Sequence, residues 1–427
     1  MAIALAKEIS PARLAAFRIL EQVESGAFSS VLLAAEEPRL KAVDRALCHE
    51  LVLGVLRWQL LLDKIVEQFS KKRIESLDRP VRIALRLGLY QLRFLTRIPA
   101  SAAVNESVSL VRKARLSSAA AFVNALLRRA VRESEYDPAA DVSDPLEKIA
   151  VRTSHPAWLM ERWASWLGID QAEAFAQANN LVPPTAFRVL AQRANQSEIL
   201  SKLSAAGAVL ESSNVADGAW RVSGATSVLR ELSAAGEIYL QDEASQLVAQ
   251  VVEAKRGERV LDLCAAPGGK TTMIAERTFV VAADRSPARM ETVIATMRLH
   301  QLDGITPVIL DAANPLPFWP ETFDKVLVDA PCSGTGTLRR NPEIRWRLTS
   351  DDIVVLAEQQ KRILSRALEM VKSGGRLVYS TCSVEREENE DVIAEVPSQF
   401  RLLNTVRTWP HREGCDGFFV AVFERRV

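Results

Sequence analysis

Residues 260–272 read Val-Leu-Asp-Leu-Cys-Ala-Ala-Pro-Gly-Gly-Lys-Thr-Thr, and this stretch decides the fold of the C-terminal part of the chain. An apolar run that stops in small, turn-forming residues predicts a buried strand, a tight loop and the first turn of a helix. Glycines such as Gly268 and Gly269 let the backbone approach a ligand closely, as in the βα turns that bind nucleotides. We therefore expect an open α/β sheet with a ligand at this loop.

Strands and helices alternate from residue 238 onward, which is typical of a parallel sheet. The predicted strands cover residues 258–263, 279–283, 306–310, 325–328 and 376–380. Cys264, Asp284, Asp311 and Asp329 follow four of them at the carboxyl end. Ligands of open α/β sheets bind at that edge, and a carboxylate there is costly unless it meets a ligand or water. Three acidic strand ends in register predict a binding site.

Three classes of cofactor compete for the loop. The dinucleotide fingerprint GxGxxG is absent, because Gly268 and Gly269 are adjacent. The phosphate loop GxxxxGK(S/T) is a closer match, since Gly269-Lys270-Thr271 fits it. However, Cys264 stands where the first glycine of that motif belongs, so the phosphate cradle is incomplete.

S-adenosylmethionine is the third candidate, and the residues favour it. Its sulfonium is cationic and its ribose has two free hydroxyls, so it needs carboxylates and little phosphate-binding apparatus. Asp284 suits the ribose of either a dinucleotide or S-adenosylmethionine, and Asp311 suits the adenine edge. The predicted cofactor-binding residues are Cys264, Ala265, Ala266, Pro267, Gly268, Gly269, Lys270, Asp284, Asp311 and Asp329.

Two cysteines follow predicted strands at this edge, Cys332 in Asp-Ala-Pro-Cys-Ser-Gly and Cys382 in Ser-Thr-Cys-Ser. Cytosine C5 is too weak a nucleophile to attack a methyl sulfonium, but a thiolate that adds to C6 makes C5 nucleophilic. The reaction needs an activated thiol with a lowered pKa and a base for the C5 proton. The alternative for each cysteine is a role as a small buried side chain. Spacing does not tell which thiol attacks.

Two charged side chains of the same edge have more than one possible partner. Asp329 suits either the N3/N4 edge of a cytosine or the methionine end of the cofactor. Lys270 suits the charge of a thiolate or of a ligand. The sequence leaves these assignments open.

Composition limits the class of protein. The chain has 427 residues, of which 48% are hydrophobic and 25% charged, so it can bury ordinary cores. Five cysteines without a CxxC pair argue against a disulfide framework and against zinc, so we expect no metal and a reducing compartment. Residues 1–8 show no signal peptide, and no apolar stretch approaches the roughly 20 residues that span a bilayer. We expect a soluble, cytoplasmic monomer.

The N-terminal part is predicted to be helical from residue 10 to residue 133. Helices are expected from Ser10-Pro11 onward and near residues 44–69, 78–95, 102–114 and 119–131. Residues 1–140 carry 22 Lys+Arg against 15 Asp+Glu, a net charge of +7, and the remainder carries 32 against 38, a net charge of −6. An arginine-rich region suits phosphates, although arginines such as Arg86 are also typical of amphipathic surface helices.

A polar linker is predicted at residues 135–145, and a small α+β module follows it. The tryptophans Trp158, Trp163 and Trp166 favour a core more than a base-stacking platform. Strand-like pieces occur at residues 186–190, 208–210 and 220–222. We expect three domains: an all-α domain (1–140), a small α+β module or linker (141–236) and a catalytic α/β domain (237–427).

Three motifs resemble the RNA cytosine-C5 methyltransferases: Cys264-Ala-Ala-Pro-Gly-Gly-Lys-Thr, Asp329-Ala-Pro-Cys-Ser-Gly-Thr-Gly and Ser380-Thr-Cys-Ser. Residues 103–113 and 122–129 resemble the RNA-binding protein NusB, and residues 416–421 resemble a closing hairpin. The combination is similar, over nearly the whole chain, to the bacterial family of 16S ribosomal RNA methyltransferases B. This implies a NusB-like bundle, a small α+β module and a class I, Rossmann-like methyltransferase domain.

The resemblance also implies roles for the site residues. Cys382 matches the nucleophile of the family, and Cys332 matches the cysteine that assists product release. S-adenosylmethionine would be the methyl donor and 16S ribosomal RNA the partner, either naked or in a partly assembled subunit. The target base must leave its stack, which costs least in a single-stranded loop. Arg285, beside the ribose carboxylate, departs from the family pattern.

Two other functions compete with this interpretation. The first is a NusB-like RNA-binding or assembly protein whose methyltransferase fold is vestigial. The second is the same chemistry on transfer RNA, against which only the NusB-like bundle speaks. Methylation of an exocyclic amine is disfavoured, because it needs no thiol and uses an Asn/Asp-Pro-Pro-aromatic loop where this chain has Asp-Ala-Pro-Cys.

Overall fold

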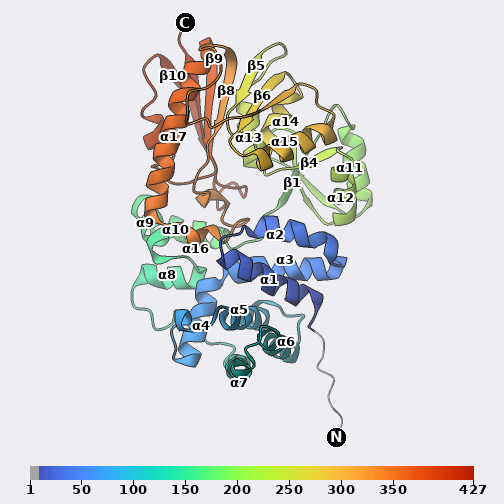
Figure 1. Ribbon diagram of the computed structural model, residues 1–427, viewed down its shortest axis with the longest axis vertical. Helices are drawn as coiled ribbons and strands as arrows, with labels where there is room; N and C mark the ends of the chain where they lie inside the picture. Colours follow the sequence, from blue (N-terminus) through green and yellow to red (C-terminus); the bar gives the residue numbers. More distant parts are fainter. Residues whose placement is uncertain (1–8) are drawn as a thin grey trace. The chain divides into compact units, whose positions relative to one another are not determined.

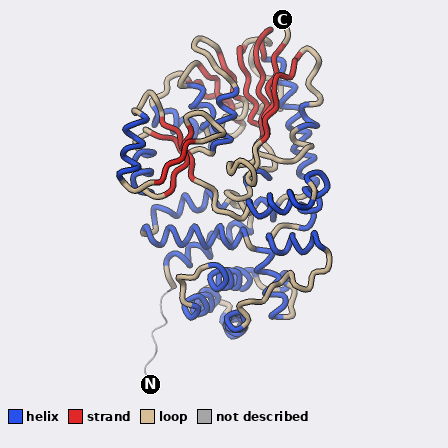
Figure 2. The backbone as a smooth tube through the Cα atoms, turned by 180° about the vertical axis from the view of Figure 1, so that it is seen from behind, coloured by secondary structure: helices blue, strands red, loops and turns tan. Residues whose placement is uncertain are grey.

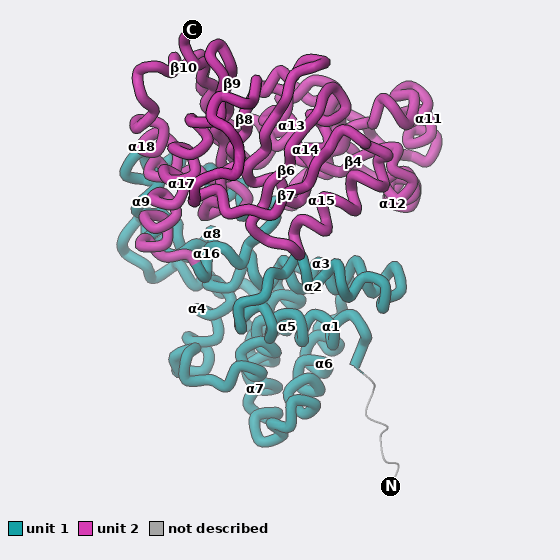
Figure 3. The backbone as a smooth tube through the Cα atoms, turned by 45° about the horizontal axis from the view of Figure 1, so that its top comes forward, with its two compact units in different colours: residues 1–181, 338–347 teal, residues 182–337, 348–427 magenta. Residues whose placement is uncertain are grey.

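The computed structural model describes residues 9–427, so residues 1–8, where no signal peptide is predicted, lie outside the described part. The chain divides into two compact units (Figure 3). Unit 1 comprises residues 1–181 and 338–347, and unit 2 comprises residues 182–337 and 348–427. The division into domains at residues 140 and 236 stays a prediction. Within residues 9–427, no helix is long and apolar enough to cross a membrane.

Unit 1 is all-helical (Figure 1). Its helices are α1 (Pro11–Glu24), α2 (Ser29–Glu36), α3 (Ala42–Arg57), α4 (Gln59–Ser70), α5 (Arg79–Phe94), α6 (Ala100–Lys113), α7 (Ala120–Arg132), α8 (Pro145–Thr153), α9 (Ala157–Leu167), α10 (Ile169–Ala178) and α16 (Ile344–Arg347). The helices predicted at residues 78–95, 102–114 and 119–131 are confirmed. Helix α2 lies in the region predicted to be helical, but its bounds were not predicted, and α8 was not predicted at all. Each has only eight or nine residues and too few turns to show a period.

The core of the bundle contains one buried ion network that the sequence did not predict. Arg86 on α5 is only 5% exposed, so the interpretation of its helix position as a surface position is wrong. Its guanidinium donates to Asp63 on α4 at 2.7 Å and to Glu24 on α1 at 2.6 Å. These pairs compensate the cost of burying the charge and fix three helices to one another.

The segment Leu338–Arg347 belongs to unit 1, although residues on both sides of it belong to unit 2. Arg345 in this segment is fully buried. Its guanidinium donates to oxygens at the carboxyl ends of α3, α8 and α10: Arg57 O, Ser154 O, Asn179 O and Asn180 Oδ1, at 3.0–3.4 Å. Helix carboxyl ends carry unpaired carbonyls and partial negative charge, so a cation there is stabilising.

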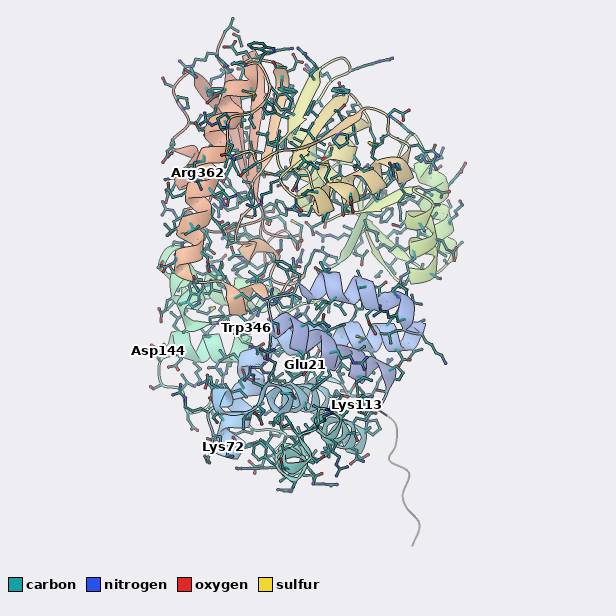
Figure 4. The ribbon with its side chains drawn as sticks, in the orientation of Figure 1. Glu21, Lys72, Lys113, Asp144, Trp346 and Arg362 are labelled. Atoms are coloured by element: carbon teal, nitrogen blue, oxygen red, sulfur yellow. The ribbon has the colours of Figure 1, made fainter. Side chains whose placement is uncertain are left out.

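Neighbouring residues of this segment bind helix ends in the same way. Trp346, marked in Figure 4, donates its indole N–H to the Leu56 carbonyl near the end of α3 at 2.6 Å. The Glu343 carboxylate accepts the backbone N–H and the hydroxyl of Ser29 at the start of α2, both at 2.9 Å. The acidic side chain of Glu343 thus lies at the amino end of a helix, and the basic side chain of Arg345 lies at the carboxyl ends of helices. Each charge is stabilised there by the helix dipole.

Unit 2 begins with a small antiparallel sheet in the order β2-β3-β1-β4. Its elements are β1 (Thr185–Val189), α11 (Gln196–Ala205), β2 (Val209–Ser212), β3 (Ala219–Ser223), α12 (Thr226–Ala234) and β4 (Ile238–Leu240). The three predicted strand-like pieces are confirmed as β1, β2 and β3. The apolar side chains Phe187, Leu203 and Ile238 form the core between this sheet and its two helices.

The second sheet of unit 2 has seven strands in the order β10-β11-β9-β8-β5-β6-β7 (Figures 1 and 2). Its strands are β5 (Arg259–Asp262), β6 (Phe279–Asp284), β7 (Ile305–Ile309), β8 (Phe323–Asp329), β9 (Val371–Thr381), β10 (Phe400–Arg407) and β11 (Phe419–Arg425). Its helices are α13 (Glu243–Val251), α14 (Gly269–Ala275), α15 (Pro287–His300), α17 (Ser350–Met370) and α18 (Glu390–Ile393). The five predicted parallel strands and the closing hairpin are confirmed.

The strands of this sheet are apolar on both faces because each face packs against helices. Leu261, Val326 and Leu377 belong to the core that includes residues of α17. Val260, Leu327 and Val378, their neighbours along the strands, belong to the core shared with α13, α14 and α15. The chain runs from β5 through β6 to β7 and then returns to β8 on the other side of β5, so the strand order reverses between β5 and β8. A ligand site is expected at this switch point.

Candidate active site

A cavity of about 200 Å³ lies at the carboxyl edge of the parallel strands. It is lined by the strand-end residues that the sequence singled out, together with both candidate catalytic cysteines. The lining residues are Leu263, Cys264, Ala266, Asp284, Arg285, Arg289, Asp311, Ala312, Asp329, Ala330, Pro331, Cys332, Gln359, Ile363 and Cys382. A second cavity of about 150 Å³ is lined by the glycine loop, by Lys270 and Asp329, and by residues 239–241 and 245.

The glycine loop joins β5 to α14 and borders both cavities. Gly268 has a φ of 107°, a left-handed conformation that disfavours other residues. A Cβ on Gly269 would come within 2.8 Å of Cε1 of Tyr239, so this position has no room for a side chain. Beneath the loop, Asp262 accepts the Thr271 hydroxyl at 2.7 Å, and burial raises the pKa of Asp262 to about 7.

The carboxylate of Asp284 ends β6 and is only 3% exposed. It accepts the backbone N–H of Ser286 at 2.9 Å and that of Ala266 at 3.3 Å, which ties β6 to the glycine loop. Arg289 lies 3.7 Å from it and also donates to the Ala266 carbonyl at 2.6 Å. Asp311 follows β7, where it accepts the Ala313 N–H at 3.0 Å. Both carboxylates therefore face one cavity from fixed positions.

Lys270 and Asp329 form an ion pair at the point where the two cavities meet. Nζ of Lys270 lies 2.7 Å from Oδ2 of Asp329, and the Ser380 hydroxyl donates to Oδ1 of Asp329 at 2.8 Å. Burial lowers the pKa of Lys270, but Asp329, Cys382 and Asp262 together more than offset this effect, and the pKa is raised.

The two cysteines predicted at the sheet edge are in contact. Sγ of Cys332 lies 3.2 Å from Sγ of Cys382, and neither side chain is fully buried. The hydrogen bond to Cys382, together with burial, raises the pKa of Cys332 well above its usual value. Cys332 therefore stays protonated and can donate its S–H to Cys382. A raised pKa is the opposite of what activates a thiol, so Cys332 suits the role of a proton donor better than that of a nucleophile.

Cys264 is the third thiol at the cavity. Burial and the nearby carboxylates of Asp262, Asp329 and Asp284 raise its pKa well above the usual value, which keeps it unreactive. Its place at the end of β5 suits a wall of the binding site. Cys264 is therefore assigned to the wall of the site, and only Cys332 and Cys382 form the contacting pair.

Several wall residues were not predicted from the sequence. Arg289, Gln359 and Ile363 line the first cavity, and Tyr239 and Gln241 line the second. They lie on helices or outside the parallel strands, so no strand-end pattern marks them. Only the spacing of Arg289, five residues after Asp284 on the following helix, offered a signal. No group of three potential metal ligands occurs in the described part of the chain.

The residues around the cavity fit S-adenosylmethionine. Three carboxylates, those of Asp284, Asp311 and Asp329, face it, which matches a sulfonium and a ribose with two hydroxyls. The glycine loop borders this cavity through Cys264 and Ala266 and the neighbouring one through residues 264–267, 269 and 270. A parallel sheet with a switch point, successive acidic strand ends and this loop define an S-adenosylmethionine-dependent methyltransferase of the Rossmann-like class.

Comparison with known proteins identifies the family. Residues 249–424 match the family model "16S rRNA methyltransferase RsmB/F", residues 10–132 match the NusB family, and residues 155–229 match the ferredoxin-like domain of RsmF/B-like methyltransferases. The chain belongs to the RsmB/F family of methyltransferases.

The similarity extends over almost the full length of the relatives. The probable ribosomal RNA small subunit methyltransferase B of Bacillus subtilis is 33% identical over 98% of this chain and 100% of its own. The corresponding methyltransferase B of Pseudomonas putida is 38% identical over 89% of this chain and 87% of its own. The crystal structure of PH0851 has 29% identity and a TM-score of 0.83, and the match covers 99% of this chain and 100% of that one.

Proposed function

We propose that this enzyme methylates C5 of a cytosine in 16S ribosomal RNA through a covalent bond between Cys382 and C6 of the base. The observation that carries the proposal is the contact of two thiols, 3.2 Å apart, in the cavity that the strand-end carboxylates line. Cytosine-C5 methylation uses two such groups, whereas methylation of an exocyclic amine uses none. The names of the relatives from Bacillus subtilis and Pseudomonas putida support ribosomal RNA of the small subunit as the substrate.

Cys382, Lys270 and Cys332 have different roles in the proposed reaction. Cys382, as thiolate, bonds to C6 and makes C5 an enamine carbon, and the Lys270 ammonium, whose pKa Cys382 helps to raise, would stabilise that thiolate. S-adenosylmethionine, when bound, supplies the methyl group to C5. Cys332 lies against Cys382 and has the position of a group that returns a proton to the departing thiolate and assists release. As the Cys382–C6 bond breaks, Cys332, which has given its proton to the departing sulfur, takes the C5 proton and is restored as a thiol.

The cofactor would lie along the strand ends. Asp284 would accept the ribose hydroxyls, Asp311 would face the adenine, and the loop 264–270 would contact the cofactor through its backbone. Asp329 would face either the methionine end or the cytosine, because it borders both cavities. Monomeric state and cytoplasmic location are part of the same proposal.

Asp284→Asn tests the cofactor assignment. It removes the charge that two ribose hydroxyls would bond, so the dissociation constant of S-adenosylmethionine should rise by about 10- to 100-fold. Isothermal titration calorimetry on the full chain measures it. Asp303→Asn, at an exposed carboxylate, is the matched control and should bind like the wild type. An unchanged affinity in Asp284→Asn would remove Asp284 from the cofactor site.

The substrate is tested by incubating the protein and S-adenosylmethionine with unmodified 16S RNA, with partly assembled small subunits and with transfer RNA. We expect a single new 5-methylcytosine in 16S RNA, mapped by bisulfite sequencing. If only transfer RNA is marked, the chemistry stands and the substrate is wrong. If no RNA is marked, the function is that of an RNA-binding or assembly protein with a vestigial catalytic fold.

A further inference from the structure

A buried carboxylate lies directly behind the two thiols. Glu388 is fully buried and follows Cys382 by six residues, in the loop that precedes α18. Its Oε1 accepts the backbone N–H of Ser333 at 2.8 Å and the side-chain amide of Gln360 at 2.9 Å, and its Oε2 accepts the Ser333 hydroxyl. These three donors are uncharged. Burial of this carboxylate is costly and raises the pKa of Glu388, and the hydrogen bonds from its donors oppose that rise.

The hydrogen bonds of Glu388 connect the two cysteine loops. Ser333 directly follows Cys332, and Ser383 directly follows Cys382. The hydroxyls of Ser333 and Ser383 lie 3.1 Å apart. The path from Glu388 through Ser333 to Ser383 therefore fixes the residue after each thiol to the same carboxylate.

A second set of bonds clamps the other side of the Cys332 loop. Gln360 on α17 donates to the Pro331 carbonyl, one residue before Cys332, at 2.9 Å. The Tyr379 hydroxyl donates to the Glu388 carbonyl at 2.6 Å, and its oxygen lies 3.2 Å from Oε1 of Gln360. The backbone on both sides of Cys332 is thus fixed by groups that also contact Glu388.

We propose that Glu388 is a positioning residue, which holds the loops of Cys332 and Cys382 together so that the Cys332 S–H points at the Cys382 sulfur. The inference rests on the proposed function, in which Cys332 returns a proton to Cys382. Glu388 touches no reacting atom. It acts through Ser333 and Ser383, and through its charge.

The charge of Glu388 adds an electrostatic effect to the geometry. The groups that act on the pKa of Cys332 are Cys382, Glu388 and the backbone of Gly334, and of these only Gly334 lowers it. After the hydrogen bond to Cys382 and burial, the Glu388 carboxylate contributes to raising the pKa of Cys332. A nearby negative charge disfavours a thiolate, so Glu388 helps Cys332 to keep the proton that it donates.

Glu388→Gln separates the two effects. The amide oxygen can take the place of Oε1 and accept from Ser333 N–H and Gln360, while the amide NH₂ faces the Ser333 hydroxyl, which can rotate to accept it. The geometry is kept and the charge is lost. Glu388→Ala loses both and leaves the Ser333 N–H without its acceptor. Glu369→Gln, at a half-exposed carboxylate on α17, is the matched control.

The first readout is alkylation of the full chain by iodoacetamide across pH, with Cys332 and Cys382 quantified separately by mass spectrometry. It needs neither RNA nor cofactor. We expect the pH midpoint of Cys332 alkylation to fall by about half a pH unit or more in Glu388→Gln. The negative charge of Glu388, which disfavours the Cys332 thiolate, is absent from this variant. Glu369→Gln should match the wild type.

The second readout is single-turnover methylation of 16S RNA. The rate constant should fall about 10-fold in Glu388→Gln and about 100-fold in Glu388→Ala, with RNA affinity within about twofold of the wild type. A wild-type rate in Glu388→Ala would overturn the positioning role, and a wild-type alkylation midpoint for Cys332 in Glu388→Gln would overturn the effect of the charge. If the wild type methylates no RNA but the midpoint still shifts, the proposed function fails and the effect of Glu388 on Cys332 stands.

Discussion

Cys382→Ala should reduce cytosine methylation by at least about 10⁴-fold, because no other group can form the bond to C6. Of the other thiols of the cavity, Cys264 is held protonated by burial and Cys332 by its hydrogen bond to Cys382 and by burial. The measurement is the single-turnover rate of methyl transfer to 16S RNA. Binding of S-adenosylmethionine should be unchanged, which distinguishes loss of the nucleophile from loss of the fold.

Cys48→Ala is the matched control for this experiment. Cys48 lies in the core of unit 1, where burial raises its pKa to about 12, so it has no part in the chemistry. The variant should methylate at the wild-type rate. If Cys382→Ala keeps more than about one per cent of that rate, a covalent adduct on Cys382 is not part of the reaction.

Arg345→Ala should lower the free energy of unfolding of unit 1 by about 3–5 kcal/mol. The guanidinium binds oxygens at the carboxyl ends of three helices, and truncation leaves these acceptors buried without a donor. Burial, together with the charge of Arg57, lowers the pKa of Arg345 to about 9. Urea unfolding followed by tryptophan fluorescence measures the effect.

Arg97→Ala, at an exposed arginine of unit 1, is the control and should change the stability by less than about 0.5 kcal/mol. A change below about 1 kcal/mol in Arg345→Ala would contradict the account of the segment Leu338–Arg347 as a partner of the helix ends. Both variants replace an arginine by alanine, so the difference between their free energies of unfolding reports the burial and the hydrogen bonds of Arg345.

The parallel sheet and the place of the site could be predicted from the sequence because both follow from local patterns. Each strand is a short apolar run, and each ends in a residue whose chemistry differs from the run, such as Asp284 or Asp329. Since parallel strands bring their carboxyl ends to one edge, the order of these residues along the chain was enough to predict their common cavity. The roles of the individual residues in binding and catalysis stay predictions.

The remaining features depend on contacts between distant parts of the chain, which periodicity does not reveal. Glu388 and Ser333 are 55 residues apart, and Arg345 and Ser154 are 191 residues apart. Both charged residues are buried, where a sequence pattern predicts exposure for their type. Arg86 was assigned to a surface for the same reason. Buried charges with specific partners are therefore the part of this fold that sequence reasoning missed.

The central claim, a covalent bond between Cys382 and the target cytosine, is tested most directly with Cys332→Ala. This variant keeps the nucleophile and loses the thiol that lies 3.2 Å from it. After incubation with S-adenosylmethionine and 16S RNA, a denaturing gel should show protein linked to RNA, and mass spectrometry should locate the cytosine on Cys382. No adduct above the wild-type level, or an adduct on another residue, would contradict the account.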